Sequence, residues 1–318
     1  MKSRFLNGLL GAALMAAPLY AHSQTNRPMR ILVPAAAGGA IDGIARGFAQ
    51  RLGERFEQNV VVENRPGAGS QPALETLAAA AADGNTLMLL SATTVIHPLL
   101  YKSRFDISRD FAPISQLSAQ GYVLVVHPKI PVKSVPEFVQ YLRANSNRLN
   151  YGSSGIGSPI HMSGELFQLA TGTHMTHIPF KGMSPAIADL IGGSVQVSFL
   201  TTITSMPLFD AGRLRALAVT TAQRVAAIPD IPTFAEAGVS GVVVVNWYGL
   251  FAPSATPKRV IDRIAGEAAK IMRSPVIIAR LAAEGSEAVG GSPDELSALI
   301  RAEQNQWAKV IRQAGIHG

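Results

Sequence analysis

Residues 30–56 read RILVPAAAGGAIDGIARGFAQRLGERF, and this stretch predicts the class of fold. Residues 30–33 have the apolar character of a short buried strand, and the pair Gly38-Gly39 marks a turn directly after it. Apolar side chains then recur at spacings of three and four, which places one helical face at Ile41, Ile44, Ala45, Phe48 and Leu52. A strand, a glycine turn and an amphipathic helix in this order are typical of α/β proteins.

The same alternation continues along the chain. Further strands are expected at residues 59–63, 86–91, 122–127, 149–153, 175–179, 195–200 and 214–220 and in the apolar run 242–251. Helices are expected at residues 71–81, 135–144, 158–170, 185–191, 257–273 and 293–313, and Ser292-Pro-Asp-Glu295 has the spacing of a capping box. Apolar strands that alternate with helices predict parallel or mixed sheets covered on both faces. In a chain of 318 residues, this pattern favours two α/β lobes.

The composition excludes several classes of protein. Apolar residues make up 47% of the chain and charged residues only 15%, so the sequence is not that of a disordered protein. The absence of cysteine excludes disulfides, cysteine-bound zinc, iron–sulfur clusters and thiol nucleophiles. The formal charge is +7, but the basic residues are scattered and form no basic run with interleaved aromatics. We therefore expect no nucleic-acid binding, which needs a clustered basic face.

The first residues predict export. Lys2 and Arg4 precede an apolar, uncharged run at residues 5–20, and Ala21-His22-Ser23 then offers a cleavage site before the polar Gln24. This is the pattern of a secretory signal peptide, here residues 1–23, and the run is shorter than the about 20 residues of a spanning helix. The mature protein is expected to begin near Gln24 and to reside in the periplasm.

The sequence contains few patterns that are typical of catalytic or metal-binding residues. The nucleophile-elbow, P-loop and dinucleotide-binding motifs are all missing from the sequence. His161 and Glu165 are four apart on a predicted helix, with His174 and His177 nearby, but a metal site needs three or four converging ligands. Asp42 has no second carboxylate at a spacing suited to acid–base catalysis. We expect no catalytic residue, no metal and no cofactor.

Two glycine-rich turns are more informative. The first glycine turn, residues 34–40, contains Gly38-Gly39-Ala40, and the second glycine turn, residues 152–158, reads Gly152-Ser-Ser-Gly-Ile-Gly-Ser158. Each ends a predicted strand and opens a predicted helix. The first amides of a helix have no partner within it, and the helix dipole adds partial positive charge there. Two such turns, one in each lobe, predict an anion site that needs no basic side chain.

Several motifs resemble those of one receptor family along the whole predicted mature chain. The chain is similar to the Bug (Bordetella uptake gene) or TctC-type family, the solute receptors of tripartite tricarboxylate transporters. The motifs that carry the resemblance are Arg30-Ile-Leu-Val-Pro34 with Gly38-Gly39-x-x-Asp42, Val61-Val-Glu-Asn-Arg-Pro-Gly-Ala-Gly69, Asp83-Gly-x-Thr-Leu87, Asn150-Tyr-Gly-Ser-Ser-Gly-x-Gly-Ser158, His161-x-x-Gly-Glu-Leu-Phe167, His177-x-Pro-x-Lys-Gly182, Gly212-Arg-Leu-Arg-Ala-Leu-Ala-Val219, Ile231-Pro-Thr-x-Ala-Glu-Ala-Gly238, Trp247-x-Gly-Leu-x-Ala-Pro253 and Val289-Gly-Gly-x-Pro293.

The resemblance implies a two-lobed type II periplasmic-binding-protein fold with a ligand cleft between the lobes. Lobe 1 is expected at residues 24–121 plus 246–318 and lobe 2 at residues 122–245. By analogy, a ligand carboxylate is held largely by main-chain amides. The binding residues carried over to this sequence are Gly38, Gly39, Ala40, Asp42, Thr93, Thr94, Ser154, Gly155, Gly157, Ser158, Leu200 and Thr201.

The sequence departs from its relatives around this site. Relatives commonly have larger or hydroxyl-bearing residues where this chain has Ala35, Ala37, Ala40 and Ile41, and acidic or amide residues where it has Leu200 and Thr201. The loss of an acidic residue removes a partner for an amino group. One interpretation is neutral drift in a loop; the other is a less polar pocket for an aromatic or otherwise apolar carboxylate rather than an amino acid.

Three functions remain open at this stage. The leading hypothesis is a monomeric periplasmic binding protein that presents a small carboxylate to the permease subunits of a tripartite tricarboxylate-type transporter. The second is a ligand-sensing receptor for a membrane sensor kinase, which would need the same cleft. The third, a periplasmic hydrolase or lyase, has little support in the motifs.

Overall fold

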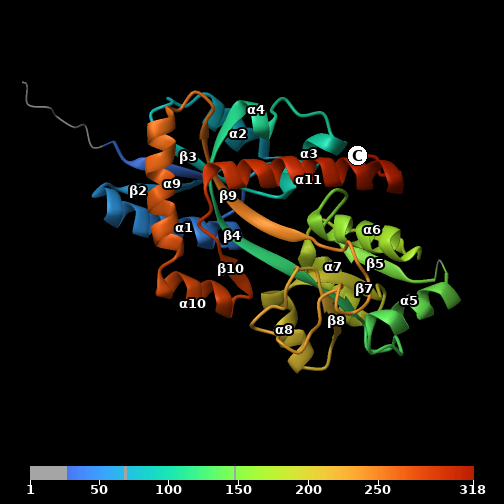
Figure 1. Cartoon of the computed structure of the whole chain (residues 1–318). Helices are drawn as coiled ribbons and strands as arrows, with labels where there is room; N and C mark the ends of the chain where they lie inside the picture. Colours follow the sequence, from blue (N-terminus) through green and yellow to red (C-terminus); the bar gives the residue numbers. More distant parts are fainter. Residues whose placement is uncertain (1–26, 68–69, 147) are drawn as a thin grey trace, which may run out of the picture.

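The computed structural model describes residues 27–67, 70–146 and 148–318 (Figure 1). The predicted signal peptide and its cleavage site lie outside these residues. Over the described ranges, no helix combines the length and the apolar character needed to cross a bilayer.

The strands form two sheets that share one long strand, β4 (Phe111–Val126). In sheet A, the strand order is β2 (Val60–Asn64), β1 (Met29–Val33), β3 (Thr86–Ser91), β9 (Val245–Pro253), β4 and β10 (Ser286–Ala288). In sheet B, β4 pairs with both β8 (Arg215–Val219) and β7 (Val197–Thr201), and β7 leads to β5 (Asn150–Ser153) and β6 (Thr176–Pro179). The expected mixed α/β architecture is confirmed.

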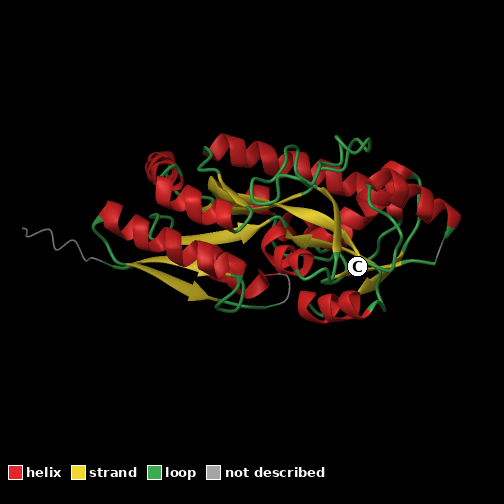
Figure 2. Cartoon of the chain, turned by 90° about the horizontal axis from the view of Figure 1, so that it is seen from below, coloured by secondary structure: helices red, strands yellow, loops and turns green. Residues whose placement is uncertain are grey.

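Helices lie on both sides of the strands, as Figure 2 shows from below. They are α1 (Ala40–Phe56), α2 (Gln71–Ala78), α3 (Thr93–Leu100), α4 (Ile107–Asp110), α5 (Val135–Ala144), α6 (Pro159–Thr171), α7 (Met183–Gly192), α8 (Thr202–Asp210), α9 (Lys258–Met272), α10 (Pro275–Ala283) and α11 (Pro293–Ala314). The helices α3, α4, α8 and α10 and the strand β10 were not expected from the sequence. They are short, which leaves few turns in which a periodic pattern can show.

The stretch quoted first folds as its pattern predicts. In α1, the buried side chains include Ala45, Phe48 and Leu52, and they pack in one core cluster with Leu87 and Leu89 of β3. At about 25 cal/mol per Å² of apolar area, each large side chain buried here contributes about 1.5–3 kcal/mol. Burial against the sheet therefore fixes α1, and with it the first glycine turn.

The directions of the strands bring four strand ends toward one another. β1 and β3 run parallel to each other and in the same direction as β4, whereas β5 and β7 run parallel to each other and opposite to β4. The carboxyl ends of β1 and β3 thus face those of β5 and β7. Ser91, at the end of β3, lies in the row of Ser118, and Thr201, at the end of β7, pairs with Tyr122. The two rows are four residue steps apart along β4, a distance of about 13 Å.

Thr220 joins the two segments that connect the sheets. Its Oγ1 accepts the amide of Tyr122 in β4 at 2.8 Å and donates to the carbonyl of Val244, just before β9, at 2.6 Å. Its own amide and carbonyl bond to the same two residues. The long helix α11 also spans this region, since it packs against α3, β4 and α6 (Figure 1).

Candidate ligand-binding site

All four segments that carry predicted binding residues are helix N-termini that follow strands. Gly39 is the N-cap of α1, Ala92 that of α3, Ser158 that of α6 and Thr201 that of α8. They follow β1, β3, β5 and β7, whose ends face one another across the middle of β4. Each helix start carries partial positive charge.

The first glycine turn exposes backbone donors. Its residues 36–40 are exposed, and Gly39 caps α1 without any side-chain hydrogen bond. Within the described ranges, the amides of Gly39, Ala40 and Ile41 donate no hydrogen bond. This turn therefore keeps the unpaired amides that the sequence predicts.

Asp42 lies behind this turn and organises it. The side chain is buried, and its carboxylate accepts hydrogen bonds of 2.9 Å from the amide of Gly38, from Arg46 Nε and from Asn64 Nδ2. The Arg46 hydrogen bond, followed by that of Gly38, lowers the pKa of Asp42 to about 2. The structure thus gives Asp42 a supporting position, and Arg46 and Asn64 are supporting residues that sequence reasoning missed.

The second glycine turn uses most of its amides internally, which the sequence did not suggest. Gly157 donates its amide to His161 Nδ1 at 3.1 Å, and Gly155 donates to Ser153 Oγ at 3.1 Å. The amide of Ser158 bonds to the carbonyl of Gly155, and its hydroxyl caps α6 by accepting the amide of His161. The expectation that both turns leave these amides unpaired is therefore wrong for Gly155, Gly157 and Ser158.

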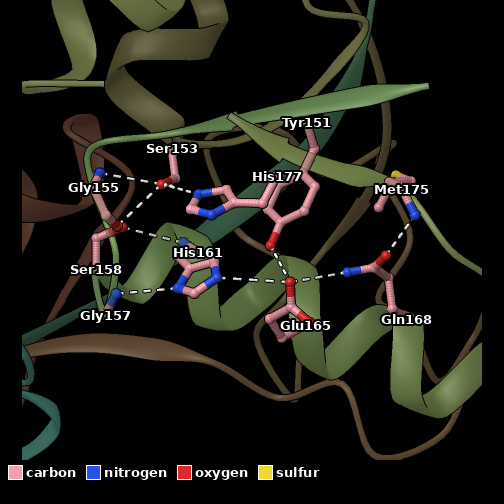
Figure 3. Close-up of polar contacts among 10 residues, drawn as sticks. All are labelled: Tyr151, Ser153, Gly155, Gly157, Ser158, His161, Glu165, Gln168, Met175 and His177. Carbon is pink, nitrogen blue, oxygen red and sulfur yellow. Dashed lines mark hydrogen bonds and ion pairs between the residues drawn. The ribbon is translucent and has the colours of Figure 1, made fainter. Parts of the chain in front are cut away.

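A compact polar cluster supports the second glycine turn (Figure 3). The rings of His161 and His177 stack with centroids 3.9 Å apart, and His177 also stacks on Tyr151 at 4.8 Å. His177 Nε2 lies 2.7 Å from Ser153 Oγ. On the other side, Glu165 Oε1 accepts a hydrogen bond from the Tyr151 hydroxyl and faces His161 Nε2 at 3.6 Å.

Burial keeps the histidines of this cluster neutral. Loss of solvent lowers the pKa of His161 to about 4 and that of His177 to about 3, with repulsion from His161 adding to the second effect. Burial also raises the pKa of Glu165, although the hydrogen bonds from Tyr151 and Gln168 oppose the rise. His174 is exposed and precedes β6, and its charge adds to the effects that oppose the rise at Glu165.

The pair Ser153 and His177 does not form a catalytic nucleophile and base. Ser153 is fully buried, so a substrate has no access to its hydroxyl. That hydroxyl already bonds to both the amide and the carbonyl of Gly155. Glu165, the neighbouring acid, faces His161 rather than His177. The hydrogen bonds of the cluster instead reach the amides of the second glycine turn.

The other predicted binding residues differ in the exposure of their side chains to solvent. Thr93, the first residue of α3, is exposed, whereas Thr94 is buried. Leu200 is 1% exposed and belongs to the core cluster behind β7. Thr201 is half-buried, and its hydroxyl lies 2.8 Å from that of Thr204. Of these four side chains, Thr93 and Thr201 retain access to solvent.

The second glycine turn touches α3. A Cβ placed on Gly157 would lie 2.5 Å from Leu100 Cδ1 and 3.8 Å from Ile96 Cγ2. The structure thus brings the second glycine turn against the helix that begins at Thr93. A side chain at position 157 would separate these two segments.

Buried polar side chains lie on β4 and β9 between the facing strand ends, and sequence reasoning missed them. Gln120 pairs with Asn246, and Asn246 Nδ2 donates to the Tyr248 hydroxyl at 3.0 Å. Ser286 in β10 donates to Gln120 Oε1 at 3.2 Å. All but Ser286 are nine-tenths or more buried. An asparagine inside the apolar run 242–251 was the signal that could have revealed them.

Comparison with known proteins identifies the family. A family model described as tripartite tricarboxylate transporter family receptor (TctC) matches residues 44–316. The Bordetella pertussis protein BugT is 32% identical to the chain over 309 residues, which cover 96% of this chain and 95% of BugT.

Solved structures agree with this match. A protein described as a periplasmic transporter has 37% identity and a TM-score of 0.78, with 91% of this chain and 98% of that chain covered. R. palustris Rpa4515, solved with adipate, has 34% identity, a TM-score of 0.79 and the same coverage. MatC from Rhodopseudomonas palustris, solved with bound malate, has 28% identity and a TM-score of 0.75, with 89% and 98% covered. The chain therefore belongs to the TctC, or Bug, family of periplasmic solute-binding receptors of tripartite tricarboxylate transporters, which are binding proteins and not enzymes.

Proposed function

We propose that this receptor captures a small carboxylate in the periplasm and presents it to the permease subunits of a tripartite tricarboxylate-type transporter. The ligand lies between two lobes, residues 24–121 plus 246–318 and residues 122–245. Its carboxylate is held by backbone amides, foremost those of Gly39 and Ala40. The second glycine turn contributes from the opposite lobe.

One observation carries the proposal: four strand ends, each followed by a helix N-terminus, face one another across the middle of β4. The about 13 Å between their rows suits a ligand the size of a short dicarboxylate. The uncapped amides of α1 supply donors on one side. Hydrogen bonds to a charged group contribute roughly 1.5–3 kcal/mol each, so two or three can hold a carboxylate without an ion pair.

The class of ligand follows from the relatives and from the departures of this chain. Adipate and malate are the carboxylates in the Rpa4515 and MatC structures. The first glycine turn carries small apolar side chains at Ala35, Ala37 and Ala40, and Leu200 carries no charge. These features favour an aromatic or otherwise apolar carboxylate over an amino acid.

A binding screen tests this proposal. Purified mature protein is heated with adipate, malate, benzoate or aspartate, and the hits are measured by calorimetry. A ligand that binds only the native state raises its stability by RT ln(1 + [L]/Kd), so a tenfold excess over Kd gives about 1.4 kcal/mol. We expect adipate or benzoate to raise the melting temperature more than aspartate does. If no carboxylate raises it, the proposed function is wrong.

The partner and the compartment need their own measurements. A pull-down in the presence of ligand should recover the permease subunits, whereas recovery of a sensor kinase instead would place the receptor in signalling. The intact mass of periplasmic protein should correspond to a chain that starts near Gln24. A mass that retains residues 1–21 would contradict export with cleavage.

A further inference from the structure

We propose that His161 and His177 are positioning residues of the ligand site, which hold the second glycine turn so that a ligand meets a defined subset of its amides. This inference rests on the proposed function and deepens it. It concerns side chains that lie behind the turn rather than on its surface.

The bond from Gly157 determines the proton position on His161. Because Nδ1 accepts the amide of Gly157 at 3.1 Å, Nδ1 of the neutral ring carries no proton. The proton of the neutral ring is then on Nε2, the atom that faces Glu165 Oε1 at 3.6 Å. A carboxyl group opposite Nε2 favours this tautomer, in the way that a neighbouring acceptor orients a histidine that binds a metal. Glu165 thus keeps His161 ready to accept the Gly157 amide.

His177 acts on the same turn through Ser153. Its Nε2 lies 2.7 Å from Ser153 Oγ, which in turn accepts the amide of Gly155 at 3.1 Å. Ser153 is fully buried and His161 is 4% exposed, whereas His177 is half-buried. The two histidines therefore control the amides of Gly155 and Gly157, one directly and one through a hydroxyl (Figure 3).

The stacked rings make the arrangement rigid. His177 stacks on both Tyr151 and His161, with ring centroids 4.8 Å and 3.9 Å away, and the centroids of Tyr151 and His161 are 6.3 Å apart. These contacts restrict how either histidine can turn. Rotation of one ring would disturb the other ring and the bond that it makes to the turn.

As a consequence, the amides of the second glycine turn fall into two groups, those bonded within the protein and those left unpaired. The amides of Gly155 and Gly157 point to the interior, while those of Ser154 and Ile156 donate no hydrogen bond among the described residues. Ile156 is 43% exposed, so this part of the turn borders solvent. The ligand would therefore meet Ser154 and Ile156 rather than the two glycines.

Variants of His161 test the role of its acceptor atom. His161→Asn places an amide oxygen close to the position of Nδ1, whereas His161→Leu has similar bulk and no acceptor. His174→Leu is the matched control, because His174 is exposed and, among the described residues, neither hydrogen-bonds to nor stacks on the cluster; its only effect there is a charge interaction with Glu165. Each variant is compared with wild type by thermal unfolding, by adipate affinity in calorimetry and by the amide signal of Gly157 in protein labelled with ¹⁵N-glycine.

We expect His161→Leu to bind adipate about tenfold more weakly and to shift the Gly157 amide signal, while His161→Asn restores most of the affinity and the signal. His174→Leu should match wild type. The proposal is overturned if folded His161→Leu keeps wild-type affinity, or if His161→Asn is as weak as His161→Leu. Should wild type bind benzoate and not adipate, benzoate replaces adipate in this comparison. Should it bind none of the screened carboxylates, the proposed function is at fault, and the ligand-free Gly157 signal still decides: an unchanged signal in His161→Leu refutes the positioning role.

Discussion

Two glycines of the candidate site have different structural roles. Gly39 has an ordinary φ of −81°, and a Cβ there would have only the Ala36 carbonyl nearby, at 3.9 Å. Gly157 has a φ of +75°, which L side chains rarely adopt, and a Cβ there would collide with Leu100. A side chain is thus tolerated by the fold at position 39 but not at position 157. A substitution at position 39 can therefore change ligand binding without changing stability, whereas one at position 157 changes both.

Gly39→Val is expected to fold normally and to bind the carboxylate at least tenfold more weakly, because its side chain covers the amides of α1. Lys181→Ala should have a smaller effect, since Lys181 lies in neither glycine turn. Calorimetry on both folded variants gives the comparison. Loss of binding in Lys181→Ala together with normal binding in Gly39→Val would refute the backbone-amide model. Gly157→Val should lower the melting temperature and is not a clean test.

Glu303 is a buried acid on α11 that faces the indoles of Trp247 and Trp307. Burial raises the pKa of Glu303 to about 7, and the two indole N–H groups only partly oppose the rise. Neither indole reaches hydrogen-bond geometry among the described residues, and Glu303 Oε2 is also unpaired. The protonated form is therefore the one that the fold prefers.

The sign of the pH dependence follows from this preference. The stabilising effect of the protonated acid is fully present below the unfolded pKa of about 4.5 and is lost as the pH rises through about 7. At pH 8, the free energy of unfolding of Glu303→Gln should exceed that of wild type by at most about 3 kcal/mol, so the variant should unfold at a higher urea concentration. At pH 4.5, the two proteins should unfold at nearly the same urea concentration. The exposed Glu287→Gln is the control. Equal effects of Glu303→Gln at both pH values would contradict a buried protonated acid.

At the scale of single elements, β4 is the strand that joins the two sheets. Its register with β9 shifts twice, between Pro113 and Ser115 and between Gln116 and Ser118. Each bulge inserts a residue and disrupts the alternation of buried and exposed side chains. The second half, which has no such shift against β7, is continuously buried. Against β8 the second half shifts once, between Leu124 and Val125, so the two halves of β4 differ in burial more than in regularity.

These features explain what the sequence could and could not predict. Residues 122–127 were readable as a strand because they are continuously apolar, while the bulged half of β4 has no period of two. The glycine turns were readable because they lie between clear strand and helix patterns. The amide of Gly157 bonds to His161, and Asp42 bonds to Arg46 and Asn64. No local sequence pattern predicts these partners.

The capping box of α11 gives a prediction at this scale. Ser292 Oγ accepts the amide of Glu295, and the Glu295 side chain accepts the amide of Ser292. Ser292→Ala should lower the free energy of unfolding by about 1 kcal/mol, as loss of an N-cap does. Ser274 also precedes a helix, but its hydroxyl makes no capping bond to α10 and donates instead to the carbonyl of Ile271 in α9 at 2.7 Å, so Ser274→Ala should cost less. Urea unfolding measures both. An equal or larger loss in Ser274→Ala would contradict this assignment.

At the scale of the whole molecule, the two proposed lobes are connected where β4 and the segment before β9 pass side by side. Thr220 bonds to both segments, and α11 packs on elements from both proposed lobes. A ligand that contacts both glycine turns binds the closed form better, and only such a difference in affinity can shift the conformational equilibrium. Motion between the lobes would have to bend the chain near Thr220.

We expect the radius of gyration to fall when saturating ligand is added to the ligand-free protein. Small-angle scattering measures this change. Gly39→Val at the same ligand concentration is the control and should scatter as the ligand-free protein does. Identical curves for wild type with and without ligand would contradict closure.

The position of β9 in sheet A constrains the order in which the protein can be assembled. β9 lies between β3 and β4, yet it follows both in the chain, after all of sheet B. As the chain is synthesised from its N-terminus, sheet B can be complete by residue 219, whereas the edges of β3 and β4 that face β9 stay unpaired until residue 253 arrives. Such late, long-range pairing is slow, and the open edges invite pairing with other chains. A polypeptide halted before β9 would therefore keep these edges of sheet A open to aggregation and proteolysis.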